Sequence, residues 1–392
     1  MADQPIRRAQ SCALDARQAV QEFHAAVSQP EMELVIFFCS SEYDLDVLAE
    51  EMRRLFAGVQ VVGCTTAGEI GPDGYRQHSL AGVSFSVGCC VAVSGLLDRL
   101  SQFDIARGHD FAQGLLQRLE SKAEDTSPGN SFALLLIDGL SMREESVAHA
   151  LQYGLGDIML FGGSAGDDMR LKQTLVYRDG RFHADSAALI LIRTSLPFKV
   201  FKTQHFVSAG ERMVVTEADP AKRIVKEING LPAAEEYARL VGVNVLDLNS
   251  LWFASSPVVV MVDGTDYVRS IQKANPDGSL VFFCAIEEGL VLRVARGVGL
   301  VPNLEQAFEQ IRAEIGPLQL VIGCDCILRN LEISRDGSKD QVGAIFQRNN
   351  TVGFSTYGEQ FHGVHINQTL TGVAIGTAPE LAEDPAQDVR ND

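Results

Sequence analysis

Short apolar runs alternate along the chain with longer segments in which apolar residues recur at helical spacing. Residues 34–39, 132–137 and 187–192 are apolar throughout or nearly so and have the length of buried strands. Residues 13–27 and 44–56 place apolar side chains three or four positions apart and contain no proline, which predicts amphipathic helices. The pattern predicts an α/β fold without the regular strand–helix alternation of a doubly wound nucleotide-binding fold.

Turn signals between short strand-like runs predict antiparallel pairs. Asp179-Gly180 separates residues 175–177 from 181–183, and this dipeptide is typical of a two-residue hairpin turn. Asn229-Gly230 predicts a further hairpin, and Pro276-Asp277-Gly278 marks a turn between two later strands. The predicted fold class is therefore mixed α/β with much antiparallel strand.

One stretch of sequence occurs twice, near opposite ends of the chain. Residues 61–69 (VVGCTTAGE) return as residues 351–359 (TVGFSTYGE), and the match continues without a gap from 80–85 to 370–375. A weaker copy lies between them in the chain and includes residues 161–167 (FGGSAGD), so that residues 351–359 form the third copy in chain order. A repeat of this size indicates related α/β units, so we expect the first and last copies to occupy equivalent positions in related substructures.

Each copy holds a glycine-rich loop with a hydroxyl residue and a closing acid. Two interpretations of the first two loops stay open: a ligand-contacting loop, and a structural turn whose side chains satisfy backbone groups. The third copy favours a ligand site, because Tyr357 lies within it and His362, His365 and Asn367 follow. The candidate ligand-contacting residues are Thr66, Glu69, Ser164, Asp167, Thr356, Tyr357, Gly358, Glu359, Asn367 and, upstream of the third loop, Arg329.

Composition and charge narrow the class of protein. The chain has 392 residues, 46% of them hydrophobic, which is enough for two or three domains. Its net charge of -18 disfavours nucleic acid as a partner, because an acidic chain repels phosphate backbones. No apolar run approaches the ~20 residues of a membrane span, and cysteines without a secretory signal favour the reducing cytoplasm. Because no nucleotide-binding loop or catalytic motif stands out, we expect no enzyme.

Five segments, taken in order, resemble the FIST family. They are VVGCTTAGEI (61–70), FGGSAGDD (161–168), residues 216–242, GCDCILRNLE (323–332) and GFSTYGEQFHGVHINQT (353–369). The resemblance implies two related FIST domains built from repeated α/β units. The expected divisions are an N-terminal helix in 1–29, a FIST N domain in 30–200, a FIST C domain in 201–378 and a disordered acidic tail in 379–392.

The resemblance also implies a function, that of an intracellular sensory protein. A stand-alone FIST protein is similar to the bacterial nitric-oxide-sensing haem proteins. Such a protein would bind haem b, take up nitric oxide and inhibit a partner sensor histidine kinase that controls biofilm formation or quorum signalling, and a homodimer is possible. The alternative is a haem-free module that binds a small metabolite, such as an amino acid, between the two FIST domains. An enzyme ranks third.

A haem cofactor needs an axial ligand, most often histidine. We rank His365 first as the iron ligand, then His362 and His205, because they lie near the third loop or near the expected domain boundary, where ligand sites tend to form. A zinc site is the competing interpretation, with Cys324 and Cys326 joining His362 and His365. Because Cys-x-Cys within a strand is not the usual zinc knuckle, we expect these cysteines to pack in the core.

Overall fold

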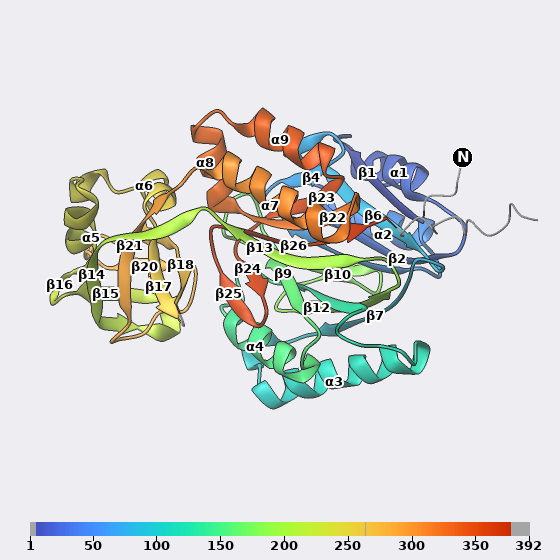
Figure 1. Ribbon diagram of the computed structural model, residues 1–392, viewed down its shortest axis with the longest axis horizontal. Helices are drawn as coiled ribbons and strands as arrows, with labels where there is room; N and C mark the ends of the chain where they lie inside the picture. The colour runs from blue at the N-terminus through green and yellow to red at the C-terminus, as the bar shows by residue number, and fades with distance from the viewer. Residues whose placement is uncertain (1–4, 263, 378–392) are drawn as a thin grey trace, which may run out of the picture.

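The computed structural model describes residues 5–262 and 264–377 (Figure 1). The expected acidic tail lies outside the described residues. The chain forms a core of three related α/β units, and a smaller β-rich domain lies at one side of this core, at the left of Figure 1.

The first two units follow one another along the chain. The first contains β1 (Ile6–Ser11), α1 (Ala16–Val27), β2 (Met32–Ser40), α2 (Leu45–Leu55), β3 (Gln60–Thr66), β4 (Glu69–Gly71), β5 (Gly74–Arg76) and β6 (Leu80–Ser86). The second contains β7 (Cys90–Leu97), α3 (Ile105–Lys122), β8 (Ser131–Ile137), α4 (Glu144–Leu155), β9 (Leu160–Ser164), β10 (Val176–Arg178), β11 (Arg181–His183) and β12 (Ala187–Thr194). The two units thus share one order of strands and helices.

The third unit repeats this order except that it is interrupted after its first strand and has two helices, in place of one, between its two parallel strands. It contains β13 (Phe198–Gln204), then, after the inserted segment, α7 (Leu300–Ile315), β22 (Leu318–Cys326), α8 (Ile327–Arg335), α9 (Lys339–Arg348), β23 (Thr351–Thr356), β24 (Glu359–Phe361), β25 (Val364–Ile366) and β26 (Thr369–Gly376). The expected boundary between residues 200 and 201 falls inside β13.

Strand pairing confirms that the repeated sequences are equivalent. In the first unit β2 is parallel to β3 and antiparallel to β6, and in the third β22 is parallel to β23 and antiparallel to β26. The weaker copy has the same strand pairing, since β8 is parallel to β9 and antiparallel to β12. The prediction of related substructures is correct for the first and last copies, and the weaker middle copy has the same pairing.

The units exchange hairpins in a closed cycle. The hairpin β4–β5 of the first unit pairs with β23 of the third, β24–β25 of the third pairs with β9 of the second, and β10–β11 of the second pairs with β3 of the first. Each sheet is therefore completed by its neighbour. Because every exchanged hairpin follows a repeated loop, the exchange brings the three loops together.

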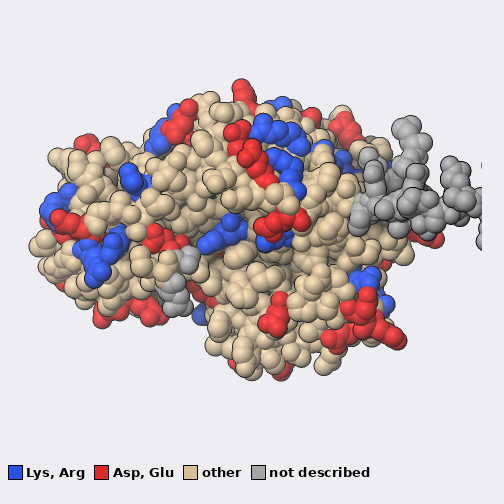
Figure 2. Space-filling model, viewed as in Figure 1, with Lys and Arg blue, Asp and Glu red and all other residues tan. Residues whose placement is uncertain are grey.

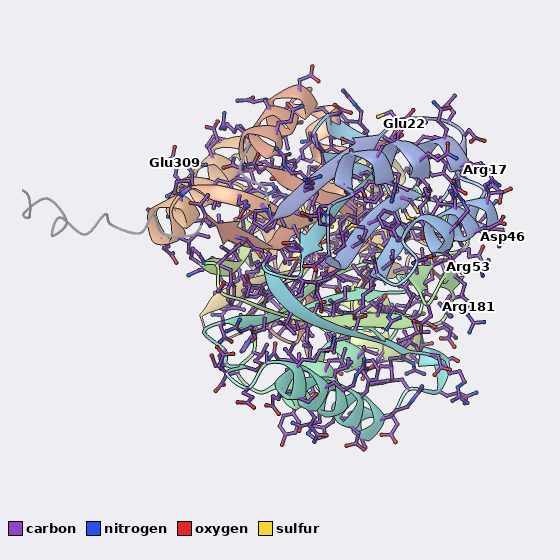
Figure 3. All side chains as sticks on the ribbon, turned by 90° about the vertical axis from the view of Figure 1, so that its right-hand side faces the viewer. Arg17, Glu22, Asp46, Arg53, Arg181 and Glu309 are labelled. Carbon is purple, nitrogen blue, oxygen red and sulfur yellow. The ribbon has the colours of Figure 1, made fainter. Side chains whose placement is uncertain are left out.

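The apolar strands are explained by two-sided burial. Alternate residues of all three sheets form one central cluster, in which Phe38 stacks on Phe354 with ring centroids 4.7 Å apart. The opposite face of each sheet packs against its own helices. The outer faces of these helices are polar, and Figure 3 shows Arg17, Glu22, Asp46 and Arg53 at the periphery of α1 and α2. This arrangement accounts for amphipathic helices around continuously hydrophobic strands.

The inserted domain spans the chain between β13 and α7. It contains β14 (Phe206–Asp219), β15 (Ile224–Ile228), β16 (Leu231–Pro232), α5 (Ala233–Val241), α6 (Ser250–Ser255), β17 (Val258–Val262), β18 (Thr265–Arg269), β19 (Ile271–Ala274), β20 (Leu280–Phe282) and β21 (Val291–Gly297). It has a hydrophobic cluster of its own. The turns predicted at Asp179-Gly180 and Asn229-Gly230 are present, with positive φ at all four residues.

Candidate ligand site

The first glycine of each repeated loop has a structural role. A Cβ on Gly63 would lie 2.5 Å from the carbonyl oxygen of Phe37 on the neighbouring strand. At the equivalent Gly162 and Gly353 a Cβ would collide with the carbonyl oxygens of Leu135 and Gly323. The glycine that the three copies share at this position therefore reflects the close approach of parallel strands.

The three loops meet at the centre of the core and are joined by backbone hydrogen bonds. The bonds run from Ala67 N–H to Ser355 O at 3.0 Å, from Ser164 N–H to Gly358 O at 2.9 Å and from Gly166 N–H to Thr65 O at 3.0 Å. Sequence segments up to about 290 positions apart thus form one site. Most of the predicted loop residues lie in it or beside it.

Glu69 in the first loop is buried and fully hydrogen-bonded. Its Oε2 accepts the N–H and the hydroxyl of Ser79 at 3.0 and 2.7 Å, and the Thr66 hydroxyl donates to Oε1. Burial raises the pKa of Glu69 to about 8 despite these bonds. Thr66 and Glu69 therefore fit the structural interpretation that the sequence left open.

Glu359 is the counterpart of Glu69 in the third loop, but one of its oxygens is unpartnered. Its Oε2 accepts the N–H and the hydroxyl of Thr369 at 3.0 and 2.7 Å. The Thr356 hydroxyl donates instead to the carbonyl oxygen of Ser164 at 2.7 Å, which leaves Glu359 Oε1 without a partner among the described residues. The third loop is thus the incomplete member of the set.

Asp167 closes the second loop in a different way. Its carboxylate accepts three successive backbone N–H groups, those of residues 171–173, and the hydroxyl of Tyr357. The strand position that Glu69 and Glu359 hold in their hairpins is held in the second hairpin by Val176. Asp167 therefore anchors a longer loop and positions Tyr357.

A cavity of about 170 Å³ lies where the second unit, the third loop and the inserted domain meet. Its walls include Gly139, Leu140 and Glu144 of the second unit, Tyr357 of the third loop, and Arg223 and Phe283 of the inserted domain. Three wall positions, Met142, Leu171 and Arg223, have φ of 54°, 52° and 54°. Such angles are uncommon outside glycine and collect at functional sites, so the cavity is the leading candidate for a ligand site.

Arg223 ties the inserted domain to the core at the edge of this cavity. Its Nη2 donates to Glu144 Oε2 at 2.5 Å and to Glu145 Oε2 at 2.6 Å, and its Nη1 donates to the carbonyl oxygen of Phe283 at 2.7 Å. Glu145 Oε1 also accepts the N–H of Ala285. Sequence reasoning missed all three charged residues, because paired glutamates at a helix start are ordinary.

His365 occupies the position in its hairpin that Tyr75 occupies in the first. The Tyr75 hydroxyl donates to Asp325 at 3.1 Å in the sheet that it joins. His365 joins the sheet of the second unit. In that sheet Ile137 lies opposite the loop serine Ser164, just as Asp325 lies opposite the loop serine Ser355 in the third unit. His365 Nε2 consequently has no hydrogen-bond partner in the described part of the chain.

Unpartnered buried atoms are concentrated around the third hairpin. They are Arg329 Nη2, Glu359 Oε1, Gln360 Oε1, His365 Nε2, both polar atoms of the Asn367 side chain and Gln368 Oε1. The equivalent segment of the first unit, residues 69–79, has no such atom within the described structure. Each unsatisfied buried group costs about 1–3 kcal/mol, so these atoms indicate a place for a ligand or ordered water.

His365 predicts that part of the stability is lost in acid. Burial lowers the pKa of His365 to about 4, whereas an unfolded histidine titrates near ~6.5. The contribution of the neutral His365 ring to the free energy of unfolding is therefore fully present above pH ~6.5. It declines as the pH falls toward 4, by about 3 kcal/mol in all. Urea unfolding at pH 7, 5.5 and 4.5 should show a flatter pH dependence for His365→Leu, while the exposed control His149→Leu keeps the slope of the unaltered chain.

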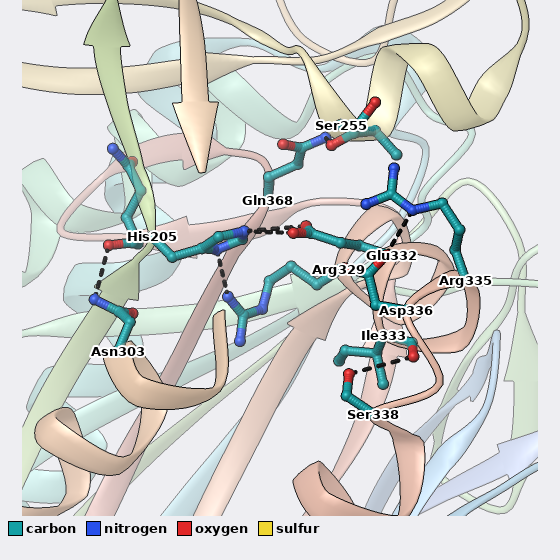
Figure 4. Close-up of polar contacts among 12 residues, drawn as sticks. His205, Ser255, Asn303, Arg329, Glu332, Ile333, Arg335, Asp336, Ser338 and Gln368 are labelled. Carbon is teal, nitrogen blue, oxygen red and sulfur yellow. Dashed lines mark hydrogen bonds and ion pairs between the residues drawn. The ribbon is translucent and has the colours of Figure 1, made fainter. Parts of the chain in front are cut away.

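Arg329 and His205 form a second polar group, at the connection between core and inserted domain (Figure 4). Arg329 is fully buried; its Nε donates to Asp325 at 2.6 Å and its Nη1 donates to His205 Nδ1 at 3.1 Å. Nε2 of the same imidazole then carries the proton and donates to Glu332 at 3.0 Å. Burial lowers the pKa of His205, which keeps the ring neutral.

These geometries do not fit haem at any of the three ranked histidines. Both ring nitrogens of His205 are engaged, and His362 is exposed at the tip of its hairpin. His365 Nε2 is unpartnered, but a Cβ placed on Gly358 would lie 2.7 Å from it, so the ring packs directly on that loop. The cavity that Tyr357 of the same loop lines has a volume of about 170 Å³, which is smaller than the ~300–1,000 Å³ of sites for drug-sized ligands.

The geometry does not support the competing zinc interpretation either. Cys324 and Cys326 are both buried and pack in hydrophobic clusters, as expected. Within the described residues, no group of three or more His, Cys, Asp or Glu side chains is placed to hold a metal ion.

No helix in the described ranges is long and apolar enough to cross a membrane.

The fold and the site define a protein of three repeated α/β units whose third unit carries an inserted β-rich domain. The chain belongs to the FIST family: the FIST N domain matches residues 33–231 and the FIST C domain residues 233–362. It is thus a FIST-domain sensory protein. The junction of the two matches lies inside the inserted domain, between β16 and α5.

Comparisons with curated proteins and with solved structures give no further information about the function. No curated protein matches the chain. One similar solved structure is that of a cyanuric acid hydrolase described as an evolutionary innovation by structural concatenation; it is 10% identical, covers 51% of this chain and 71% of its own, and has a TM-score of 0.30. A TM-score this low supports no conclusion about this chain.

Proposed function

We propose that this FIST protein senses a small polar metabolite, which it binds without turnover at the cavity between the core and the inserted domain. One observation carries the proposal: the cavity that Tyr357 of the third loop lines together with Glu144 of the core and Arg223 of the inserted domain, in the unit whose loop and hairpin hold the unpartnered buried atoms. Polar groups left unsatisfied in the apo protein gain hydrogen bonds when a ligand enters.

The inserted domain supplies a means of output. Arg223 and Phe283 of that domain line the cavity, while Glu144 and Tyr357 of the core line its other side. A ligand that touches both sides favours one arrangement of the two parts over another, and this difference in affinity is what a partner protein reads. An amino-acid-like molecule fits the volume. A sensor histidine kinase is the partner that the family resemblance implies.

The surface also bears on the partner. On the face that Figure 2 shows, acidic and basic side chains are interspersed over both the core and the inserted domain. With a net charge of -18, the chain as a whole favours a partner with a basic patch. Association with such a partner would weaken as the salt concentration rises.

Haem-based nitric oxide sensing is the competing proposal, supported by the family resemblance and not by the packing of the three histidines. The test compares the two on one preparation. Native mass spectrometry and thermal melting against a set of small polar metabolites should give a ligand that raises Tm in the unaltered chain. The Gln272→Leu variant, which removes a polar side chain from the cavity wall, should lose this response, whereas Asn303→Leu, which removes a half-buried amide outside the wall, should keep it.

Haem titration of the same samples provides the contradicting outcome. A Soret band that saturates at one haem per chain and disappears in His365→Ala, with no response to any metabolite, would replace the present proposal with haem sensing. Kinase autophosphorylation assays with and without the identified ligand then test the output.

A further inference from the structure

A second pocket, of about 440 Å³, lies in the first unit between the end of α2 and the hairpin β10–β11. It is separate from the candidate ligand site, because the two share no lining residue. Its volume falls within the ~300–1,000 Å³ of small-molecule sites. The wall combines apolar side chains with two arginines, and its members include Ala57, Val59, Tyr177, Arg53 and Arg178.

The three repeats show what controls this space. In each unit, the helix residue ten positions before the first glycine of the repeated loop lies against a glycine of the hairpin that the unit receives. The three contacts are Arg53 with Gly180, Gln152 with Gly363 and Gly343 with Gly74. The side chain at this helix position therefore decides what fills the space between helix and hairpin.

In the second unit a glutamine fills the space. Gln152 is buried, and its amide donates to the carbonyl oxygens of Gly156 and Ile158 at 2.8 and 2.9 Å. Its Oε1 accepts the N–H of Leu160 at 3.0 Å. The N–H of His362 donates to Leu160 O at 2.8 Å, which ties the turn of the hairpin to the strand.

In the first unit the space stays open. The side chain of Arg53 is exposed and passes over Gly180, where a Cβ would lie 3.0 Å from Arg53 Cδ. The bond equivalent to that of His362, from Asp179 N–H to Val61 O, is not formed in the described structure. The turn is therefore not tied to the strand, and the pocket lies between them.

The charges of this pocket are not balanced. Its wall holds Arg53, Arg178 and one carboxylate, that of Asp179, which pairs with Arg178. Arg53 makes no ion pair within the described residues, whereas the neighbouring Arg54 pairs with Glu51 at 2.5 Å. One positive charge of the wall is thus left without a counter-charge.

Arg181 adds a further positive charge at the turn. It lies directly opposite Arg178 in the hairpin, and like charges at such positions are destabilising. Figure 3 shows Arg181 and Arg53 close together at the edge of the molecule. A neighbouring carboxylate, Glu33, is already paired with Lys122 at 3.8 Å. An anion bound here would compensate the excess of positive charge.

The equivalent groove of the third unit has no such excess. Its wall holds Asp73 and Asp340 beside Arg76 and Lys339. The surplus of arginine is therefore particular to the first unit, in a chain whose net charge is -18.

We propose that the pocket of the first unit binds a small organic anion, a carboxylate on an apolar body, whose charged group pairs with Arg53. The apolar wall residues accommodate the body, and the guanidinium matches the two oxygens of a carboxylate. The carbonyl groups at the end of α2 carry partial negative charge, so the carboxylate is expected on the hairpin side of the pocket. This site is additional to the one under the proposed function.

The test compares benzoate with benzamide and benzylammonium, three probes of similar shape, by calorimetric titration of the unaltered chain at pH 7. The Kd of benzoate should be about tenfold or more below those of the other two, because a hydrogen bond to a charged group is the stronger one. Arg53→Gln installs the residue of the second unit and should remove this preference. Arg54→Gln, which changes the adjacent exposed arginine outside the wall, should keep it.

Three outcomes would overturn the proposal. If benzamide or benzylammonium binds as tightly as benzoate, the anion class is wrong. If Arg54→Gln loses the preference as Arg53→Gln does, binding follows the overall charge of the surface and not this pocket. If none of the probes binds, the site is wrong. Each of these results leaves the proposed function to its own test with Gln272→Leu, because Arg53 is no part of that cavity wall.

Discussion

Replacing Arg329 with leucine is expected to lower the free energy of unfolding by about 3–5 kcal/mol. Arg329 is fully buried and is the cation to which Asp325 and His205 are bonded, at 2.6 and 3.1 Å. Without it, Asp325 becomes a buried carboxylate whose remaining side-chain partner is the hydroxyl of Tyr75. Removing one member of a buried ion pair costs more than the pair itself contributes, because the other charge stays desolvated.

Arg335→Leu is the matched control, on the same helix. Arg335 is partly exposed and pairs with its sequence neighbour Asp336 at 2.7 Å, so its loss should change stability by no more than about 0.5 kcal/mol (Figure 4). Urea unfolding followed by circular dichroism measures both variants at pH 7. Equal effects would mean that Arg329 is not an essential counter-charge. The double variant Asp325→Leu/Arg329→Leu should cost less than the sum of the single changes.

The parts of the fold that depend on local pattern could be predicted from the sequence. The gapless match between residues 61–85 and 351–375 established two equivalent units, because side-chain alternation and glycine spacing record how a strand packs. The hairpin turns at Asp179-Gly180 and Asn229-Gly230 were predictable for the same reason, since both residues of such a turn need positive φ.

The long-range pairings were not predictable. Hairpin β4–β5 pairs with β23, nearly 300 positions away, and no local pattern specifies which sheet edge a short hairpin joins. The interruption of the third unit was also hidden, because strands of an inserted domain read like any others. The expected boundary at 200/201 reflects where the copies end, whereas the chain crosses between core and insert near His205.

The candidate site was predicted in part. The sequence favoured the third loop over the first two, and the structure shows a difference between them: Glu359 Oε1 lacks the bond that the loop threonine, Thr66, gives to Glu69 Oε1. Ranking His365 first selected a buried histidine with a free nitrogen, although its surroundings do not fit haem. Arg223, Glu144 and Glu145 were missed because their partnership exists only when the insert rests on the core.

That partnership leads to the second large effect, which concerns Arg223. Substitution by methionine is expected to lower the free energy of unfolding by about 2–4 kcal/mol and to loosen the inserted domain. Glu144 is buried beside Glu145, and the only guanidinium that bonds to both within the described residues is Arg223, at 2.5 and 2.6 Å. The two carboxylates would then repel one another at the start of α4, and the bond to Phe283 O would be lost.

Hydrogen exchange locates this effect. In Arg223→Met, amides of residues 221–225 and 281–286 should exchange at least tenfold faster, while the central strands β2, β8 and β22 change much less. Lys222→Met is the control, since the neighbouring Lys222 is exposed and its pair with Asp219 lies at the surface. Adding Glu144→Gln to Arg223→Met should restore part of the lost protection, because it removes the uncompensated buried charge. If the double variant is as loose as Arg223→Met, the repulsion between the two glutamates is not what opens the junction, and the cavity is held closed by apolar packing alone.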